Sequence, residues 1–260
     1  MNGVGNLIVG YNEDASPPAT RTGSHNLVVG QSHSYSNVAG VVAGDHNTVS
    51  GFASSVTGGT YNVASGNLSA VTGGLSNLAS DQGSTVSGGA SNVAGPGFFL
   101  PFVVSGGYQT VSGGSANRAT GIGSSVSGGS GNIASGIRSS VSGGTINTAS
   151  GDDASVSGGK RNQASDTVAS VSGGNCNVAG AAPFPFPVEC PGGETGLSSV
   201  TGGYKNRASG NYSAVTGGDM NTASGGSAVV SGGGSLTQAN GVGWSGGSSG
   251  VAVSGKFSSP

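Results

Sequence analysis

The chain has 260 residues, of which 55 are glycine and only 7% are charged, and its formal net charge is −2. Eight Lys and Arg residues in all form no basic cluster that could bind nucleic-acid phosphates. No run of about 20 apolar residues could span a membrane, and residues 1–3 have neither the basic region nor the apolar core of a signal peptide. We therefore expect no nucleic-acid partner, no membrane insertion by this segment and no signal peptide in it.

Residues 1–40 keep only a loose rhythm, and we expect them to form irregular coils that cap the N-terminal end of the fold. Three histidines lie in or near this region: His25, His33 and His46. Their spacing matches no metal-binding motif, so we expect all three on the surface. The sequence offers no candidate metal ligands and no candidate cofactor site.

Residues 41–230 repeat one 15-residue pattern, V-[ST]-G-G-x-x-N-x-A-[ST]-G-x-x-[SA]-[STA], with valine at position 1 and asparagine at position 7. Such a short period is typical of a solenoid, in which each repeat forms one coil and neighbouring coils bury each other. A disordered chain would have no reason to keep these residues at fixed positions. The repeat predicts an all-β, single-stacked parallel β-roll, or β-solenoid, of 15-residue coils. The valines at position 1 are Val41, Val56, Val71, Val86, Val111, Val126, Val141, Val156, Val171, Val200, Val215 and Val230.

Variability at each position indicates which way its side chain points, because side chains alternate between the faces of a strand. Position 8 accepts apolar and charged residues alike, so it faces outward, whereas asparagine at 7, alanine at 9 and valine at 1 face inward. We expect glycine at position 3 to let the two halves of the coil approach closely. Buried amides need partners, so the asparagines should form a ladder in which each side chain donates to a carbonyl of the next coil. The predicted ladder is Asn62, Asn77, Asn92, Asn117, Asn132, Asn147, Asn162, Asn177, Asn206 and Asn221.

Two insertions interrupt the repeat, near residues 95–104 and 181–195, and both leave the coil directly after the alanine at position 9. Insertions in repeat proteins often carry binding, so we expect the specificity of the protein to lie here. The phenylalanines of these loops either pack on the roll or between chains, which is worth about 1.5–3 kcal/mol each, or form an exposed patch that docks a partner. The candidate contact residues are Phe98, Phe99, Phe102, Phe184 and Phe186.

Both cysteines belong to the second insertion and the coil that it leaves, Cys190 in the former and Cys176 in the latter. A disulfide between them would fasten the loop to its own coil in an oxidising environment, and two free thiols are the alternative. Residues 231–260 read as degenerate coils that cap the C-terminal end. Trp244 there takes the valine position of the motif, and we expect it to cover the end of the core.

The S-V-x-x-G core and the A-S-G turn, as in residues 140–144 (SVSGG), resemble the YadA-like head repeats of trimeric autotransporter adhesins over roughly residues 41–230. Similar runs occur in tail-fibre-like proteins of phages and bacteria. The resemblance implies a left-handed parallel β-roll whose three chains pack side by side as a homotrimer. The family repeat reads nearer to S-V-A-I-G, and residues 7–10 and 27–30 restore its second apolar position.

No catalytic signature is present in the sequence, and no position of the repeat is consistently acidic. We therefore expect a non-enzymatic structural or adhesive segment of a fibre or head, located at the cell surface, outside the cell or on a virion. Its partner would be a glycan, an extracellular-matrix protein or a host-surface protein. One alternative is a phage or phage-like tail-fibre segment that recognises a host receptor. Another is an ice-binding protein, since Ser or Thr at position 2 recurs at the strand spacing.

Overall fold

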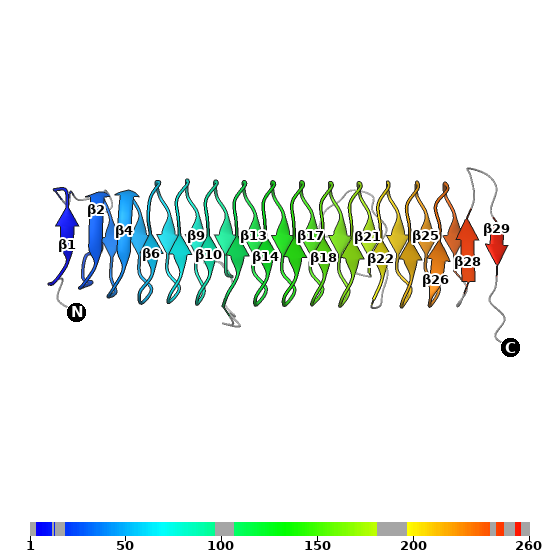
Figure 1. The fold of residues 1–260 in the computed structure, drawn as a ribbon, viewed down its shortest axis with the longest axis horizontal. Coiled ribbons are helices and arrows are strands. Elements are labelled where there is room, and N and C mark those ends of the chain that lie inside the picture. The colour runs from blue at the N-terminus through cyan, green and yellow to red at the C-terminus, as the bar shows by residue number, and fades with distance from the viewer. Residues whose placement is uncertain are drawn as a thin grey trace. The chain divides into compact units, whose positions relative to one another are not determined.

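The computed structural model describes residues 4–11, 13, 19–96, 107–180, 197–239, 243–246 and 253–255. The chain forms two compact units, residues 1–131 and 132–260. All secondary-structure elements in the described residues are β-strands, and no helix there could cross a membrane. In each unit the strands form two sheets, A and B, and successive strands of a sheet follow the order of the chain (Figure 1). The prediction of an all-β solenoid of stacked parallel coils is therefore confirmed.

In the first unit, strands from β2 onward alternate between sheet A and sheet B. Neighbouring strands pair in parallel one repeat apart, so that Val56 lies opposite Val71. Sheet A contains β1 (Leu7–Val9), β2 (Leu27–Gln31), β4 (Val41–Asp45), β6 (Ser55–Val56), β8 (Ala70–Val71), β10 (Thr85–Val86), β12 (Thr110–Val111) and β14 (Ser125–Val126). Sheet B contains β3 (Ser34–Tyr35), β5 (Thr48–Val49), β7 (Val63–Ala64), β9 (Leu78–Ala79), β11 (Val93–Ala94) and β13 (Arg118–Ala119).

The second unit repeats this arrangement, and its last two strands, β28 and β29, pair antiparallel. Sheet A contains β16 (Ser140–Val141), β18 (Ser155–Val156), β20 (Ser170–Val171), β22 (Ser199–Val200), β24 (Ala214–Val215), β26 (Ala228–Val230), β28 (Gly243–Gly246) and β29 (Val253–Gly255). Sheet B contains β15 (Ile133–Ala134), β17 (Thr148–Ala149), β19 (Gln163–Ala164), β21 (Val178–Ala179), β23 (Arg207–Ala208), β25 (Thr222–Ala223) and β27 (Thr237–Gln238).

Each regular coil places one valine and one alanine in the core. In β6 the side chain of Val56 is fully buried while Ser55 faces outward, and in β7 Ala64 is fully buried while Val63 faces outward. This alternation follows from the twofold period of a strand. Because the inward residues are small, the two sheets lie close together, and most of the remaining interior is taken up by the asparagines.

Each buried asparagine forms three hydrogen bonds, one within its own coil and two to the next coil. The Nδ2 of Asn77 donates to the carbonyl of Gly73 in its own coil (2.9 Å) and of Gly89 in the next coil (3.0 Å). Its Oδ1 accepts the backbone N–H of Asn92 at 3.0 Å. The amide therefore satisfies backbone groups at a corner where the strands have ended. Asparagines no more than 1% exposed occupy this position at Asn47, Asn62, Asn77, Asn92, Asn117, Asn132, Asn147, Asn162, Asn177, Asn206 and Asn221.

Two expectations about the register are wrong. Val42, not Val41, lies opposite Val56 and is fully buried, because this coil is one residue shorter than the repeat and the sequence offers two adjacent valines. In β28 the residue opposite Val230 is Ser245, so Trp244 does not take the valine position.

The sequence predicts unusual backbone angles for the glycines at positions 3, 4 and 11, and a close approach of the two sheets at position 3. Contact with the next coil requires glycine at positions 4 and 11, whereas a Cβ at position 3 would meet nothing closer than 3.6 Å, so the close approach expected there is wrong. The φ at position 3 is nevertheless positive in Gly88, Gly217 and Gly232. A Cβ on Gly114, at position 4, would lie 2.2 Å from the carbonyl oxygen of Gly129, and Gly114 has a φ of +84°. A Cβ on Gly136, at position 11, would lie 1.9 Å from the carbonyl oxygen of Gly151. A Cβ on Gly113, at position 3, would meet nothing within 4 Å. The tight approaches are therefore between the corners of successive coils, not between the two sheets.

Candidate functional site

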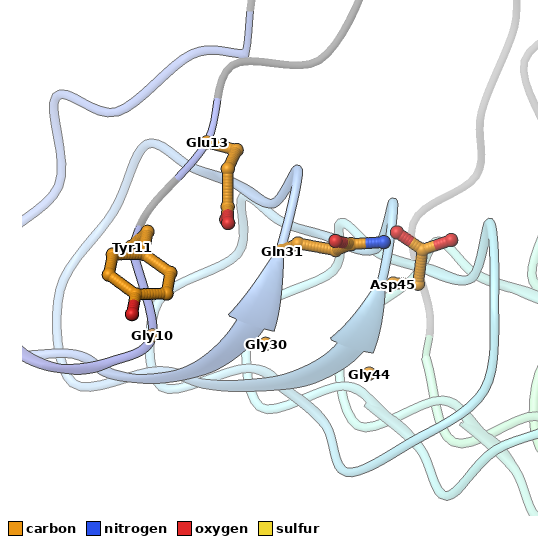
Figure 2. Close-up of a pocket in the computed structure, with 7 residues that line it drawn as sticks. All are labelled: Gly10, Tyr11, Glu13, Gly30, Gln31, Gly44 and Asp45. Carbon is orange, nitrogen blue, oxygen red and sulfur yellow. The ribbon is translucent and has the colours of Figure 1, made fainter.

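An open cavity of about 340 Å³ lies in the first unit at the corner where the strands β1, β2 and β4 end (Figure 2). We call it the N-terminal groove. The lining residues are Gly10, Tyr11, Glu13, Gly30, Gln31, Gly44 and Asp45. All of them belong to the irregular N-terminal coils or to the first coil of the repeat.

The floor of the groove is bare backbone. A Cβ on Gly30 would lie 2.1 Å from the carbonyl oxygen of Gly44, and one on Gly10 would lie 2.9 Å from that of Gly30. All three glycines have φ between +104° and +129°, which L-residues rarely adopt. Side chains are thereby excluded from the floor.

The walls of the groove are polar side chains that follow the glycines. Gln31 lies opposite Asp45 in the pairing of β2 with β4, and Tyr11 follows Gly10 at the end of β1. Tyr11 is 93% exposed, and Figure 2 shows Glu13 above the groove, between Tyr11 and Gln31. Within the described part of the chain, the side chains of Tyr11, Glu13 and Gln31 form no hydrogen bond. These three side chains are therefore available to a ligand.

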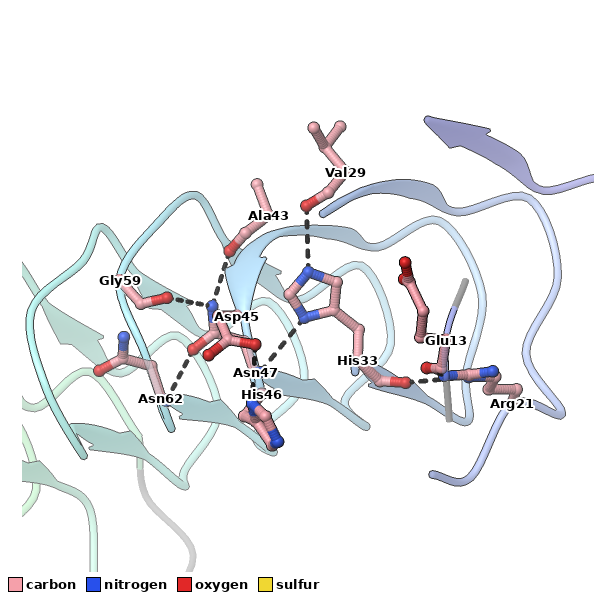
Figure 3. A network of polar contacts seen from close by, with 10 residues as sticks. All are labelled: Glu13, Arg21, Val29, His33, Ala43, Asp45, His46, Asn47, Gly59 and Asn62. Atoms are coloured by element: carbon pink, nitrogen blue, oxygen red, sulfur yellow. Dashed lines mark hydrogen bonds and ion pairs between the residues drawn. The ribbon is translucent and has the colours of Figure 1, made fainter. Parts of the chain in front are cut away.

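Two contacts position the acidic residues of the groove. His46 Nδ1 donates to Asp45 Oδ1 at 2.7 Å, which fixes the carboxylate of Asp45. Arg21 donates to the backbone carbonyls of His33 (3.3 Å) and of Glu13, so its guanidinium links Glu13 to the residue that lies just before β3 (Figure 3).

His33 supports the groove from inside and takes the place of a ladder asparagine (Figure 3). It is 1% exposed, so the expectation of a surface histidine is wrong for this residue. Its Nε2–H donates to the carbonyl of Val29 at 3.0 Å, and its Nδ1 accepts the N–H of Asn47 at 3.2 Å. Burial lowers the pKa of His33, and this pair of bonds also requires the neutral imidazole. His25 is exposed and His46 half-buried.

The groove combines two carboxylates, a primary amide and a phenol around a flat backbone surface, and its described lining residues include no cationic side chain. Carboxylate oxygens accept hydrogen bonds, the amide both donates and accepts, and an exposed tyrosine ring offers an apolar face. This set suits a hydroxyl-rich ligand such as a sugar. The described residues include no group of three His, Cys, Asp or Glu side chains that could hold a metal ion.

The predicted contact residues Phe98, Phe99, Phe102, Phe184 and Phe186 lie outside the described residues. The same holds for Cys190, so the disulfide with Cys176 stays a prediction; Cys176 itself is buried.

Sequence reasoning missed the groove, because it lies in the irregular coils where no column of the repeat can be compared. It also missed Asp81 and Asp166, which replace the otherwise uniform glycine of position 11. Aligning the 15-residue repeats in the sequence shows this change from glycine to aspartate at position 11.

Comparison with known proteins does not identify a family: no family model matches the chain, and no curated protein matches it.

Proposed function

We propose that this chain is a non-enzymatic structural and adhesive segment of a fibre or head, and that its N-terminal groove binds a glycan. The observation that carries the proposal is the presence of Tyr11, Glu13 and Gln31 around one groove with no partner among the described residues. Polar groups that are held in place without internal partners are typical of small-ligand sites.

The regular coils supply little chemical variety of their own. Their outward face in sheet A has Ser or Thr on both sides of most buried valines, as in Ser140 and Ser142 around Val141. Such a surface can give avidity, but discrimination between ligands requires a departure from the repeat. The N-terminal groove is one such departure, and the two insertions are the others.

The wider setting follows the resemblance to adhesin heads. We propose a left-handed roll in a homotrimer, located at a cell surface, outside the cell or on a virion. A phage or phage-like tail-fibre segment that recognises a host receptor is the alternative, and a neighbouring gene for an outer-membrane anchor or for a baseplate protein would distinguish the two.

A glycan array tests the proposed function. The intact chain should bind a subset of glycans, and Tyr11→Ala combined with Gln31→Ala should abolish that binding without lowering the melting temperature. Tyr212→Ala is the matched control, since Tyr212 is also an exposed tyrosine (60%) and belongs to the second unit. If deletion of residues 181–195 abolishes binding while the groove variant still binds, the loops are the contact and the assignment to the groove is wrong. Absence of binding by the intact chain would contradict the glycan as ligand.

Ice binding is a second candidate, favoured by one observation. In the described regular coils, sheet A presents two outward columns made mostly of Ser and Thr, interrupted by Ala70, Ala214 and Val229. Coils in these columns repeat at about 4.8 Å, and residues two apart lie about 6.6 Å apart. Thr57 Oγ1 donates to the carbonyl of Thr72 at 3.0 Å, which fixes that hydroxyl. Thermal hysteresis that is lost in Ser142→Tyr and Ser157→Tyr would support it, and absence of hysteresis in the intact chain would exclude it.

A further inference from the structure

Each of the two insertions leaves the solenoid one coil after a coil that has an unusual residue at position 11. In ordinary coils the A-[ST]-G turn places glycine at position 11. The coil before the first insertion has Ser80 and Asp81 at positions 10 and 11, and the coil before the second has Ser165 and Asp166. Among the regular coils aspartate occurs at position 11 in these two alone.

Ordinary coils have no room for a side chain at position 11. A Cβ there would lie 1.9–2.0 Å from the carbonyl oxygen at position 11 of the next coil, far inside any real contact distance. This holds for Gly51, Gly66, Gly136, Gly151 and Gly210. An aspartate is therefore compatible with the fold only where the next coil turns away.

At the first insertion the aspartate binds the chain where it returns. Asp81 is 6% exposed, and its Oδ2 accepts the N–H of Gly107 at 3.0 Å and the Nε2–H of Gln109 at 3.1 Å. Its Oδ1 accepts the N–H of Gln82 at 2.9 Å. In an uninterrupted coil the residue equivalent to Gly107 donates instead to a side chain of the next coil, as Ile137 N–H does to Asp152 at 2.9 Å. The coil that follows the first insertion has Ile122 at this position, so the carboxylate of Asp81 supplies an acceptor that the next coil lacks.

The exit from the solenoid has the same geometry at both insertions. Gly95 and Gly180 have φ of +112° and +109°, and a Cβ on either would lie 2.5–2.6 Å from the Oγ of Ser80 or Ser165, respectively.

The chain also rejoins the solenoid in the same way. Tyr108 N–H donates to the carbonyl of Gln82 at 2.8 Å, and Leu197 N–H to that of Thr167 at 3.2 Å. Uninterrupted coils have this bond too, as between Val168 N–H and the carbonyl of Asp152, so the chain resumes the ordinary coil at both places. Asp166 has the same position in the repeat as Asp81, and a Cβ on Gly180 would lie 2.6 Å from its carboxyl carbon.

We infer that Asp81 and Asp166 are positioning residues that let the next coil carry an inserted loop: each carboxylate fills the space that this next coil vacates, and Asp81 holds the backbone of the returning chain. The inference does not depend on what the loops bind, and it can hold or fail independently of the glycan proposal.

Asp81→Gly tests the anchor with the residue of ordinary coils, so the variant keeps a backbone that this fold accepts. Chymotrypsin, which cuts after phenylalanine, should cleave the segment around Phe98, Phe99 and Phe102 at least about tenfold faster, because two charge-assisted hydrogen bonds to the returning chain are lost. Asp81→Asn should have a smaller effect. Asp219→Gly, at an exposed turn, should leave the rate unchanged. Equal cleavage of Asp81→Gly and the unaltered chain would overturn the inference.

A graft separates a specific role from a general contribution to stability. Residues 96–107 replace residues 151–152 of an uninterrupted coil, with Ser150→Gly to match Gly95, and Gly136→Asp is then made with and without the graft. Without the graft the aspartate should lower the melting temperature, since Gly136 faces the carbonyl of Gly151. With the graft it should raise the melting temperature and slow loop cleavage. A fall in both backgrounds would overturn the inference; should the graft itself fail to fold even with Gly136→Asp, the inference is equally contradicted.

Discussion

Each ladder asparagine is bonded to backbone groups of its own coil and of the next. Asn147 Nδ2 donates to the carbonyls of Gly143 (2.8 Å) and Gly159 (3.0 Å), and its Oδ1 accepts the N–H of Asn162 (2.9 Å). The side chain is fully buried, so water cannot take over these bonds. The asparagine therefore links its own coil to the next one through hydrogen bonds.

Replacing a ladder asparagine should lower the stability of the fold. We expect Asn147→Leu to lower the free energy of unfolding by at least about 1–3 kcal/mol, because buried backbone groups are left unpaired. Thr148→Leu is the matched control: its side chain faces outward from β17, at a position where other coils have Leu78 or Ile133, and it should be nearly neutral. Urea denaturation measures both. Equal stability of Asn147→Leu and the unaltered chain would contradict the ladder.

His33 makes the N-terminal coils sensitive to acid. Because burial lowers its pKa in the folded chain, the unfolded chain binds the proton more readily. The stability due to neutral His33 is therefore present above a pH of about 6.5, the ordinary histidine pKa, and is lost as the pH falls below it. Asp45 lies near enough to oppose this shift in part.

The test is His33→Asn, which restores the usual ladder residue. The melting temperature of the unaltered chain should fall between pH 7.5 and pH 5, and His33→Asn should reduce that fall. His25→Asn, at an exposed position, serves as the control and should leave the pH dependence as it is. An identical pH profile for His33→Asn and the unaltered chain would show that another group causes the loss.

At the scale of the coil, the two adjacent glycines of the G-G pair differ sharply in what they contribute. Gly113 has open space around it, whereas Gly114 combines a φ of +84° with a carbonyl 2.2 Å from its ideal Cβ. We expect Gly113→Ala to be neutral within about 0.5 kcal/mol. Gly114→Ala should destabilise by more than about 1–2 kcal/mol, the strain of the left-handed backbone alone. Thermal unfolding of the pair checks this, and equal effects would contradict it.

The repeat predicted the coils well because the same 15-residue pattern recurs in every regular coil, so each position could be compared between coils. Valine, asparagine and alanine recur at the positions where the structure buries them, so the inward columns could be identified from variability alone. Periodicity could not place Val42 in the core in preference to Val41, since both are valines and the coil there is one residue shorter. Nor could it find the N-terminal groove, where coils differ in length and the residues brought side by side share no spacing.

For the whole molecule, we expect three chains to associate. Each regular coil buries one valine, one alanine, one asparagine and one further serine or alanine, so a single roll gains little apolar burial per residue. Association in parallel would supply more. Light scattering at micromolar concentration should give three times the chain mass of 24.4 kDa. A monomer with the full β signal in circular dichroism would contradict the trimer.

The ladder bonds within each unit have a further consequence for how such a protein changes in length. The bond from Asn77 N–H to Asn62 Oδ1 spans one repeat, and the same bond recurs from Asn92 to Asn77. Removing residues 57–71 would join Val56 to Thr72. Each remaining coil would then still lie next to a coil that has the same residue types at the corner positions. Unequal recombination between repeats can therefore lengthen or shorten the roll by whole coils while every remaining coil keeps its partners, so length can drift between related genes without any refolding of the rest.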